Sequence, residues 1–201
     1  MINLWQAHLS LAMFIFVLLP SLGLNRAWRL ALLLALLAVS CIPFDGLSLA
    51  AYVRSHTDDL AITTMLLMAW GCLRRLDLLP PAPKHRTVVW IVFAALAVAL
   101  YPATLGMSEL DPYRLGFSPR PLLIFVALLT FGLCYLRNYL AVAMLAGATL
   151  AFVVGIKPSH NYWDYLVDPL LGLYCCLALL ALTTRGLYRR FGPRHSPAQN
   201  V

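Results

Sequence analysis

The sequence predicts an all-α fold: a polytopic integral membrane protein built as a bundle of about seven transmembrane helices. Two observations lead to this fold class. Apolar residues make up 62% of the 201 residues and charged residues only 11%, a balance far outside that of soluble domains. The apolar residues also fall into separate stretches, and the charges between those stretches are sorted by sign from one loop to the next. The N-terminus is predicted to lie outside and the C-terminus in the cytoplasm.

Seven apolar stretches come near the length of a membrane span, which needs roughly 20 residues to cross the hydrocarbon core. The third, fifth and seventh are short, so we expect them to borrow flanking residues or to lie inside the bundle. Residues 1–184 thus form a single predicted transmembrane domain, followed by a basic, disordered cytoplasmic tail at 185–201. In chain order the stretches cover residues 4–24, 27–44, 60–73, 88–105, 121–136, 139–156 and 169–184.

The loops between the stretches decide the orientation. The loops after spans one, three and five, together with the tail, hold 11 of the 15 lysines and arginines and a single acid, Asp77. The remaining loops hold seven of the eight acids. By the positive-inside rule the basic side faces the cytoplasm. An odd number of spans puts the two ends of the chain on opposite sides, which agrees with this orientation.

Composition also narrows the location and the partners. Arginine strongly outnumbers lysine and no Asn-x-Ser/Thr sequon occurs, which favours a bacterial inner (cytoplasmic) membrane. The net charge of +7 lies beside the spans, where the positive-inside bias accounts for it, so membrane lipids and not nucleic acid are the expected partners. The five cysteines lie in or at the ends of apolar spans without metal-ligand spacing, so no metal and no other cofactor is predicted.

The first outer loop, residues 45–59, is predicted to contain a short helix lying in the membrane interface. Asp45 is predicted to cap this helix. Asp58 is predicted to cap span three, where the helix dipole favours an acid. Capping explains Asp59 less well, because that carboxylate falls close to the membrane level. Helical spacing within the loop connects Leu47, Ala50, Ala51 and Arg54.

Three arginines on the outer face, Arg54, Arg114 and Arg120, are candidate substrate-binding residues. A guanidinium group can hold a phosphate or carboxylate with two parallel hydrogen bonds. The alternative is that these cations pair with the acids around them. Tyr162 and Trp163 are further substrate-binding candidates, and an interfacial aromatic belt would account for them equally.

The third outer loop also contains the candidate catalytic pair, His160 and Asp164. If this stretch is helical, the two residues are four apart and share a face. A carboxylate that holds an imidazole could then serve as a general base, with Asp59 as a third candidate. The alternative is a solvated cluster at the interface. Asp168 before Pro169 is predicted to be structural, as a helix cap followed by a first-turn proline.

Span six has a small residue at every fourth position, a pattern that lets helix backbones approach closely in a membrane. We expect this stripe to pack within the bundle or, alternatively, against a helix of a membrane-protein partner. The stripe consists of Ala143, Gly147, Ala151 and Gly155.

No strong catalytic motif occurs, and the interiors of the spans hold almost no ionisable groups, which argues against a proton-driven carrier. The first expectation is therefore a non-catalytic subunit or scaffold of a cell-envelope system that assembles or exports lipid or polysaccharide. The alternative is a membrane-embedded enzyme that acts at the outer leaflet on a lipid-linked or phosphorylated substrate. A small permease or flippase is the second alternative.

Overall fold

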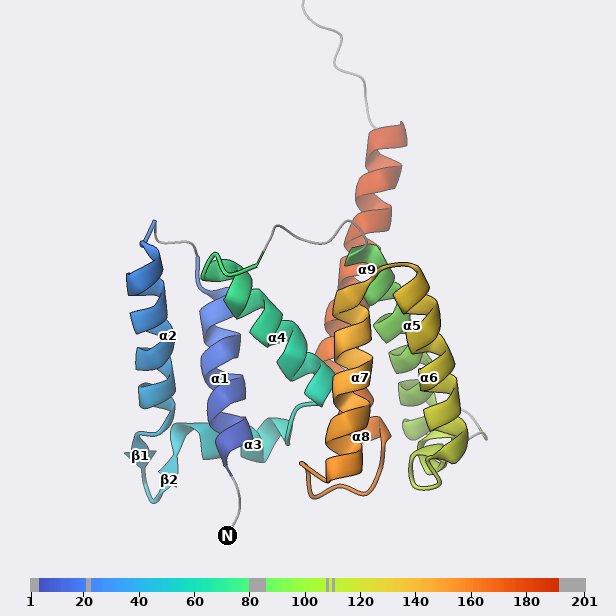
Figure 1. Cartoon of the computed structure of the whole chain (residues 1–201), viewed down its shortest axis with the longest axis horizontal. Coiled ribbons are helices and arrows are strands. Elements are labelled where there is room, and N and C mark those ends of the chain that lie inside the picture. The colour runs from blue at the N-terminus through green and yellow to red at the C-terminus, as the bar shows by residue number, and fades with distance from the viewer. Residues whose placement is uncertain (1–3, 21–22, 80–85, 108, 110, 192–201) are drawn as a thin grey trace, which may run out of the picture.

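Seven helices of 14 to 23 residues run side by side, each antiparallel to the next along the chain (Figure 1). The computed structural model describes residues 4–20, 23–79, 86–107, 109 and 111–191, and this part of the chain is all-α. The seven helices are α1 (Trp5–Leu18), α2 (Arg26–Ser40), α4 (Ile62–Arg75), α5 (Arg86–Thr104), α6 (Arg120–Tyr135), α7 (Tyr139–Val154) and α9 (Pro169–Phe191).

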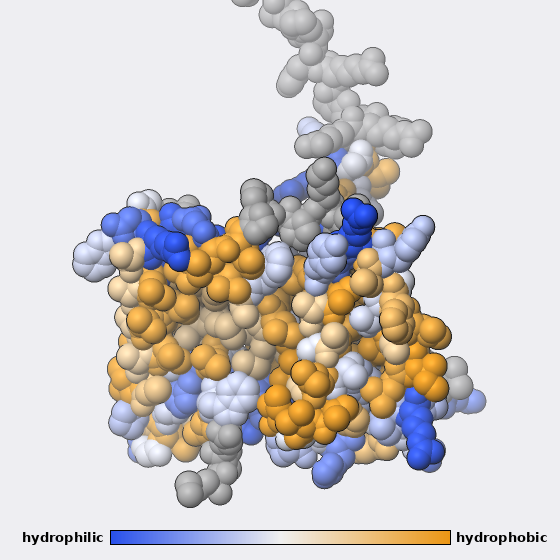
Figure 2. Space-filling model, viewed as in Figure 1, coloured by the Kyte–Doolittle hydropathy of each residue, from blue (hydrophilic) through white to orange (hydrophobic). Residues whose placement is uncertain are grey.

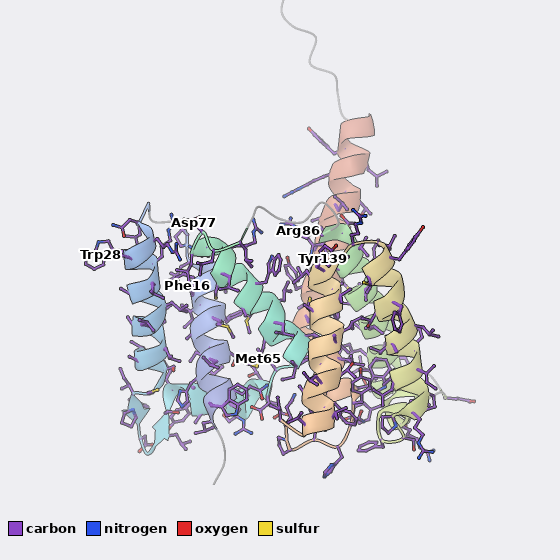
Figure 3. The ribbon with its side chains drawn as sticks, viewed as in Figure 1. Phe16, Trp28, Met65, Asp77, Arg86 and Tyr139 are labelled. Carbon is purple, nitrogen blue, oxygen red and sulfur yellow. The ribbon has the colours of Figure 1, made fainter. Side chains whose placement is uncertain are left out.

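The short elements gather at one end of the bundle, the lower end in Figure 1. This end corresponds to the outer side predicted from the sequence, and we call it the outer end. The opposite, inner end carries the predicted cytoplasmic loops, with Trp28, Asp77, Arg86 and Tyr139 visible there in Figure 3. The outer-end elements are the hairpin β1 (Pro43–Phe44) and β2 (Leu47–Ser48), the helices α3 (Leu49–Thr57) and α8 (Trp163–Leu166), and the 3₁₀ helix η1 (Pro112–Gly116).

Each of the seven predicted spans overlaps one of the seven long helices of the described residues, and the short helix predicted in the first outer loop is α3. By length and apolar composition, α5 and the Pro169–Tyr188 part of α9 could cross a membrane, whereas α1, α6 and α7 are apolar but shorter. The helix α9 continues to Phe191, beyond the predicted tail boundary at residue 185. The rest of that tail, from residue 192, lies outside the described residues.

The core lies where α4, α5, α7 and α9 meet. α5 packs along α9, and α4 packs along α7. Phe93, Met144 and Leu145 are completely buried there, together with Cys175. A smaller cluster around Phe16 joins α1 to α4. The bundle therefore has an N-terminal lobe, α1 to α4, and a C-terminal lobe, α5 to α9, which are joined mainly through α4 and α7.

The outward faces of several helices are apolar. On α6, side chains that point away from the bundle are between 51% and 89% exposed, as for Phe125 and Tyr135. On α2, Leu30 and Leu34 are exposed in the same way. Figure 2 shows the result as an apolar band between two more polar ends. Contiguous apolar surface of this kind is rare on monomeric soluble proteins and marks a surface that meets another apolar phase or a partner.

The turn before α3 differs from the prediction for Asp45. Asp45 and Gly46 have φ angles of 46° and 84° and form the two-residue turn of the β1–β2 hairpin. Asp-Gly suits such turns because both central residues need a positive φ. The N-cap of α3 is instead Ser48, whose side chain accepts a hydrogen bond from the backbone N–H of Ala51 at 3.2 Å.

The small-residue stripe of α7 has members with different surroundings. A Cβ at Gly147 would meet the Leu66 side chain of α4 at 2.5 Å, and Ala151 is buried, so these two residues face the bundle. Ala143 is exposed. Gly155 is the C-cap of α7 and has a left-handed backbone with φ of 70°. The observed close approach is therefore made by Gly147 to α4 of the same chain.

Candidate functional site

A network of charged side chains joins the loops of the two lobes at the outer end. We call it the polar cluster and define it as Arg54, Asp59, Lys157, Asp164 and Asp168. α3 supplies the first residue and the α3–α4 connection the second. The third outer loop, with the short helix α8, supplies the other three. Three of the five, Arg54, Asp59 and Asp164, are sequence-predicted site residues.

Lys157 is the centre of the polar cluster, although only 7% of its surface is exposed, and it follows the outer end of α7. Its Nζ donates hydrogen bonds to the backbone carbonyls of Asp59 at 2.7 Å, Asp164 at 2.8 Å and Leu60 at 3.3 Å. Burial lowers the pKa of Lys157, and the nearby carboxylates of Asp164 and Asp59 oppose that shift. The ammonium group therefore holds the α3–α4 connection against the third outer loop.

Arg54 and Asp59 form an ion pair with an Nη2–Oδ2 distance of 2.7 Å. The pair is well shielded, since the Arg54 side chain is 20% exposed and the Asp59 side chain 8%. The second carboxylate oxygen of Asp59, Oδ1, is buried without a hydrogen-bond partner among the described residues. The structure thus joins a predicted substrate-binding residue to a predicted catalytic residue, and leaves one acceptor of that pair unused.

Asp164 binds partners other than His160. Its carboxylate accepts hydrogen bonds from the Tyr113 hydroxyl of η1, at 3.1 Å to Oδ1, and from the Ser159 hydroxyl. Burial raises the pKa of Tyr113, and the Asp164 carboxylate raises it further. His160 is exposed, and within the described part of the chain no hydrogen bond joins it to Asp164. The two predicted catalytic residues are therefore not brought together.

His160 and Asp164 are kept apart by Asn161, which lies between them in the sequence and has a fully buried side chain. Its Oδ1 accepts the backbone N–H of Trp163 at 2.9 Å, and its Nδ2 donates to the Tyr113 carbonyl at 3.1 Å. This local side-chain-to-backbone bond replaces a helical turn, so α8 begins only at Trp163 and His160 has no helical register with Asp164. A Cβ at Gly116 of η1 would overlap the Asn161 side chain, which is why this position needs glycine.

Asp168 caps two backbone segments at once. Its Oδ1 accepts the N–H of Leu171 in the first turn of α9 at 2.7 Å, which confirms the predicted cap. Its Oδ2 accepts the N–H of Ala61, at the start of α4, at 2.8 Å. Asp58, the residue predicted to cap that helix, instead ends α3 with φ of 58°, so its expected role falls to Asp168.

The remaining predicted substrate-binding residues divide into buried and exposed ones. Tyr162 and Trp163 are 0% and 4% exposed. The Tyr162 hydroxyl bonds the Thr149 hydroxyl at 2.6 Å, and Trp163 Nε1 donates to the Pro112 carbonyl. They therefore pack the third outer loop and present almost no surface to a substrate. Arg114 and Arg120 are exposed, in η1 and at the start of α6, and neither has an ion pair with any described acid.

Two pockets open beside the polar cluster and share Asp58, Asp59 and Lys157. The larger has a volume of about 860 Å³ and also includes Arg54 and His56. The smaller, of about 270 Å³, lies on the side of Asp164 and Asp168. Among the described residues no group of three or more His, Cys, Asp or Glu side chains could hold a metal ion.

Lys157 and its three carbonyl acceptors are the main feature that the sequence reasoning missed. The signal in the sequence was a lysine directly after the apolar stretch that ends at residue 156, in an outer loop that also holds the acids Asp164 and Asp168. Comparisons with known protein families, with curated proteins and with solved structures yield no match to this chain. A function for the chain therefore has to be inferred from its own contacts.

Proposed function

We propose that the chain is a seven-span integral protein of the bacterial inner (cytoplasmic) membrane, with its N-terminus outside and its C-terminus in the cytoplasm. The apolar outward faces of α2 and α6 support this placement. α9 supports it as well, since only 17% of its most apolar 18-residue stretch is buried inside the protein. The helices of 14 to 16 residues cover about 21 to 24 Å at about 1.5 Å per residue. A hydrocarbon core of about 30 Å must thin locally around them or be met by flanking side chains.

For the role within that membrane we propose a non-catalytic subunit or scaffold of a cell-envelope system that assembles or exports lipid or polysaccharide. The observation that carries this proposal is how the outer-end polar side chains are used. Lys157 binds three carbonyls, Asp168 binds two backbone N–H groups, and Asp164 binds two hydroxyls. A side chain whose polar atoms are all engaged in hydrogen bonds within the protein is not positioned to transfer a proton to or from a substrate.

A subunit is expected to travel with its partner. We expect the tagged chain, extracted from its own membrane in a gentle detergent, to elute with a second membrane protein at a constant ratio, measured by native mass spectrometry. The exposed stripe residue Ala143 provides a contact variant, Ala143→Leu, and a partner held through this face would dissociate from it. A chain that is monodisperse and solitary in several mild detergents contradicts the proposed role.

An outer-leaflet enzyme remains the second candidate because of one observation at the larger outer pocket. His56 and Asp58 are exposed and line the pocket beside Asp59, whose Oδ1 has no hydrogen-bond partner among the described residues. A substrate donor could bind that oxygen, with an imidazole nearby to move a proton. The relevant histidine would then be His56, whereas His160 is absent from the lining of this pocket.

The two candidates differ in what they predict for histidine variants. Under the non-catalytic proposal we expect His56→Ala and His160→Ala to restore the phenotype of a deletion strain within about twofold of the unsubstituted chain. Removal of a general acid or base costs about 10²- to 10⁴-fold in rate, so an enzyme would fail this complementation test. Immunoblotting of membranes checks that each variant accumulates. Loss of function in His56→Ala at normal protein level would favour the enzyme.

A further inference from the structure

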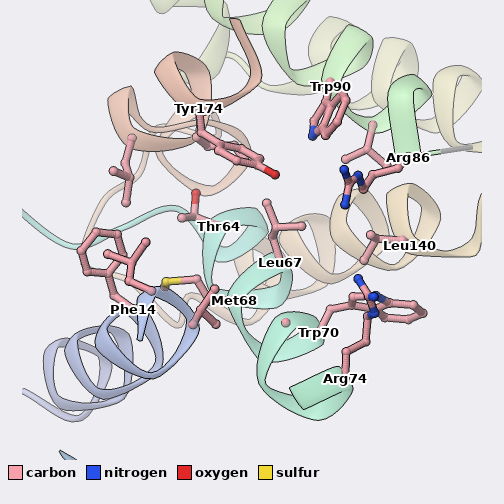
Figure 4. Close-up of a pocket in the computed structure, with 16 residues that line it drawn as sticks. Phe14, Thr64, Leu67, Met68, Trp70, Arg74, Arg86, Trp90, Leu140 and Tyr174 are labelled. Carbon is pink, nitrogen blue, oxygen red and sulfur yellow. The ribbon is translucent and has the colours of Figure 1, made fainter. Parts of the chain in front are cut away.

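A second type of pocket lies away from the polar cluster, between the two lobes and toward the inner end. It has a volume of about 310 Å³ and is walled by apolar side chains of α1, α4, α5 and α9, such as Phe14, Leu67 and Met68. Two arginines, Arg74 at the end of α4 and Arg86 at the start of α5, complete its lining. Figure 4 shows both guanidinium groups on the same side of the pocket, with Leu140 between them, and Phe14 on the far side.

Within the described part of the chain, the two arginines have no acid to neutralise them. No described Asp or Glu lines the pocket. Asp77, the single acid of the predicted inner loops, is bound to Arg29 at 2.9 Å. Arg75, next in sequence, donates instead to the carbonyls that end α1, including that of Phe16 at 2.6 Å. Arg74 and Arg86 are thus two like charges at one end of an apolar pocket, an arrangement that an anion would stabilise.

The pocket runs along most of α4. Thr64 and Arg74 both line it and are ten residues apart on that helix, which corresponds to about 15 Å at about 1.5 Å per residue. Leu170 and Leu171, in the first turn of α9, line its other end. The two arginines therefore lie at the inner end of the pocket, where the headgroups of the inner leaflet lie under the proposed membrane placement.

We propose that this pocket binds an anionic phospholipid of the inner leaflet, with its phosphate between Arg74 and Arg86 and one acyl chain along α4. The volume is at the lower end of the range of about 300–1,000 Å³ for small-molecule sites, so the pocket holds one chain and the rest of the lipid stays in the bilayer. Arg86 already stacks on Trp90, with its Cζ 4.7 Å from the ring centroid, which fixes the direction of its guanidinium group. This inference rests on the proposed membrane placement and not on the proposed role as a subunit.

Native mass spectrometry of the full chain, purified without added lipid and titrated with one lipid at a time, tests the site. We expect phosphatidylglycerol to bind at least tenfold more tightly than phosphatidylcholine, and the double variant Arg74→Gln/Arg86→Gln to remove that difference. The variant Arg26→Gln is the matched control, because Arg26 is an exposed arginine of the same end that does not line the pocket. It is expected to bind phosphatidylglycerol as the unsubstituted chain does.

A second titration, with inorganic phosphate, distinguishes a lipid headgroup from a free anion as the occupant of the pocket. A lipid site predicts that millimolar phosphate neither competes with phosphatidylglycerol nor raises the melting temperature of the chain. Competition by free phosphate, equal binding of the two lipids by the unsubstituted chain, or full selectivity in the double variant would each overturn the proposal. The lipid comparison on the unsubstituted chain needs no variant to fold. The membrane placement is tested separately by cell fractionation. A chain that is recovered in the soluble fraction and not with the membranes would contradict that placement, whatever the lipid titration shows.

Discussion

Replacement of Lys157 by methionine is expected to lower the free energy of unfolding by about 4 kcal/mol. Methionine keeps the length and apolar volume of the side chain but removes three hydrogen bonds from the ammonium group to the carbonyls of Asp59, Leu60 and Asp164. The carbonyls of Asp59 and Asp164 are left without this donor at about 1–3 kcal/mol each, whereas the Leu60 carbonyl keeps a hydrogen bond from Gln6 Nε2 at 2.7 Å. The sum for the two carbonyls exceeds any gain from removing the desolvated charge. The measurement is an unfolding titration in mixed micelles with increasing SDS.

An exposed cation of the same end supplies the control for that experiment. Arg120→Met removes a positive charge from the outer end without removing a buried hydrogen bond, and surface changes of this kind usually stay within about 0.5 kcal/mol. If Lys157→Met were as stable as Arg120→Met, the three carbonyl contacts would not hold the loops together. The proposal that the polar cluster serves structure would then lose its main support.

The long helices were predictable because helical hydrogen bonds and apolar periods are local in sequence. The stretch at residues 139–156, for example, is α7 from Tyr139 to Val154, and the turn before it contains the left-handed Arg137. Such boundaries depend on residues within a few positions of each other. The same local information predicted a short helix in the first outer loop, which the structure has as α3.

Two local features were open to more than one interpretation. Asp45-Gly46 is a common hairpin turn, but its strands are only two residues long, so no alternating pattern supported a hairpin over a helix cap. The spacing of His160 and Asp164 suits a helix only if the backbone between them is helical. Asn161 prevents this by bonding its own neighbouring backbone, which a count of residues does not register.

The polar cluster could not be predicted because its main contacts join residues that are about half the chain apart in sequence. Lys157 reaches the carbonyl of Asp59 over 98 residues, and Asp168 reaches the N–H of Ala61 over 107. Backbone carbonyls and N–H groups have no signature in a sequence, so nothing marks which of them a charged side chain will bind. The sequence predicted the end of the bundle at which the charges gather, and the packing of the lobes selected their partners.

Asp168→Ala is expected to lower the free energy of unfolding by about 3 kcal/mol, because it removes the cap of α9 and the bond to α4 together. Loss of an N-cap costs about 0.5–2 kcal/mol, and the N–H of Ala61 is left in a buried site without its charged acceptor at about 1.5–3 kcal/mol. Asp168→Asn keeps one acceptor oxygen and should lose about half as much. The free energy of unfolding of the unsubstituted chain and of the two variants is measured by titration with SDS in mixed micelles.

The matched control for Asp168 is Asp111→Ala, since Asp111 is an exposed acid of the same end whose side chain makes no capping hydrogen bond. We expect it to stay within about 0.5 kcal/mol of the unsubstituted chain. A small loss in Asp168→Ala would mean that the two lobes are held by α4 and α7 alone. A loss near the expected value, with a smaller loss in Asp168→Asn, would show that the Asp168 carboxylate connects the starts of α4 and α9 at the outer end. The stability of the two helices would then depend on the same side chain.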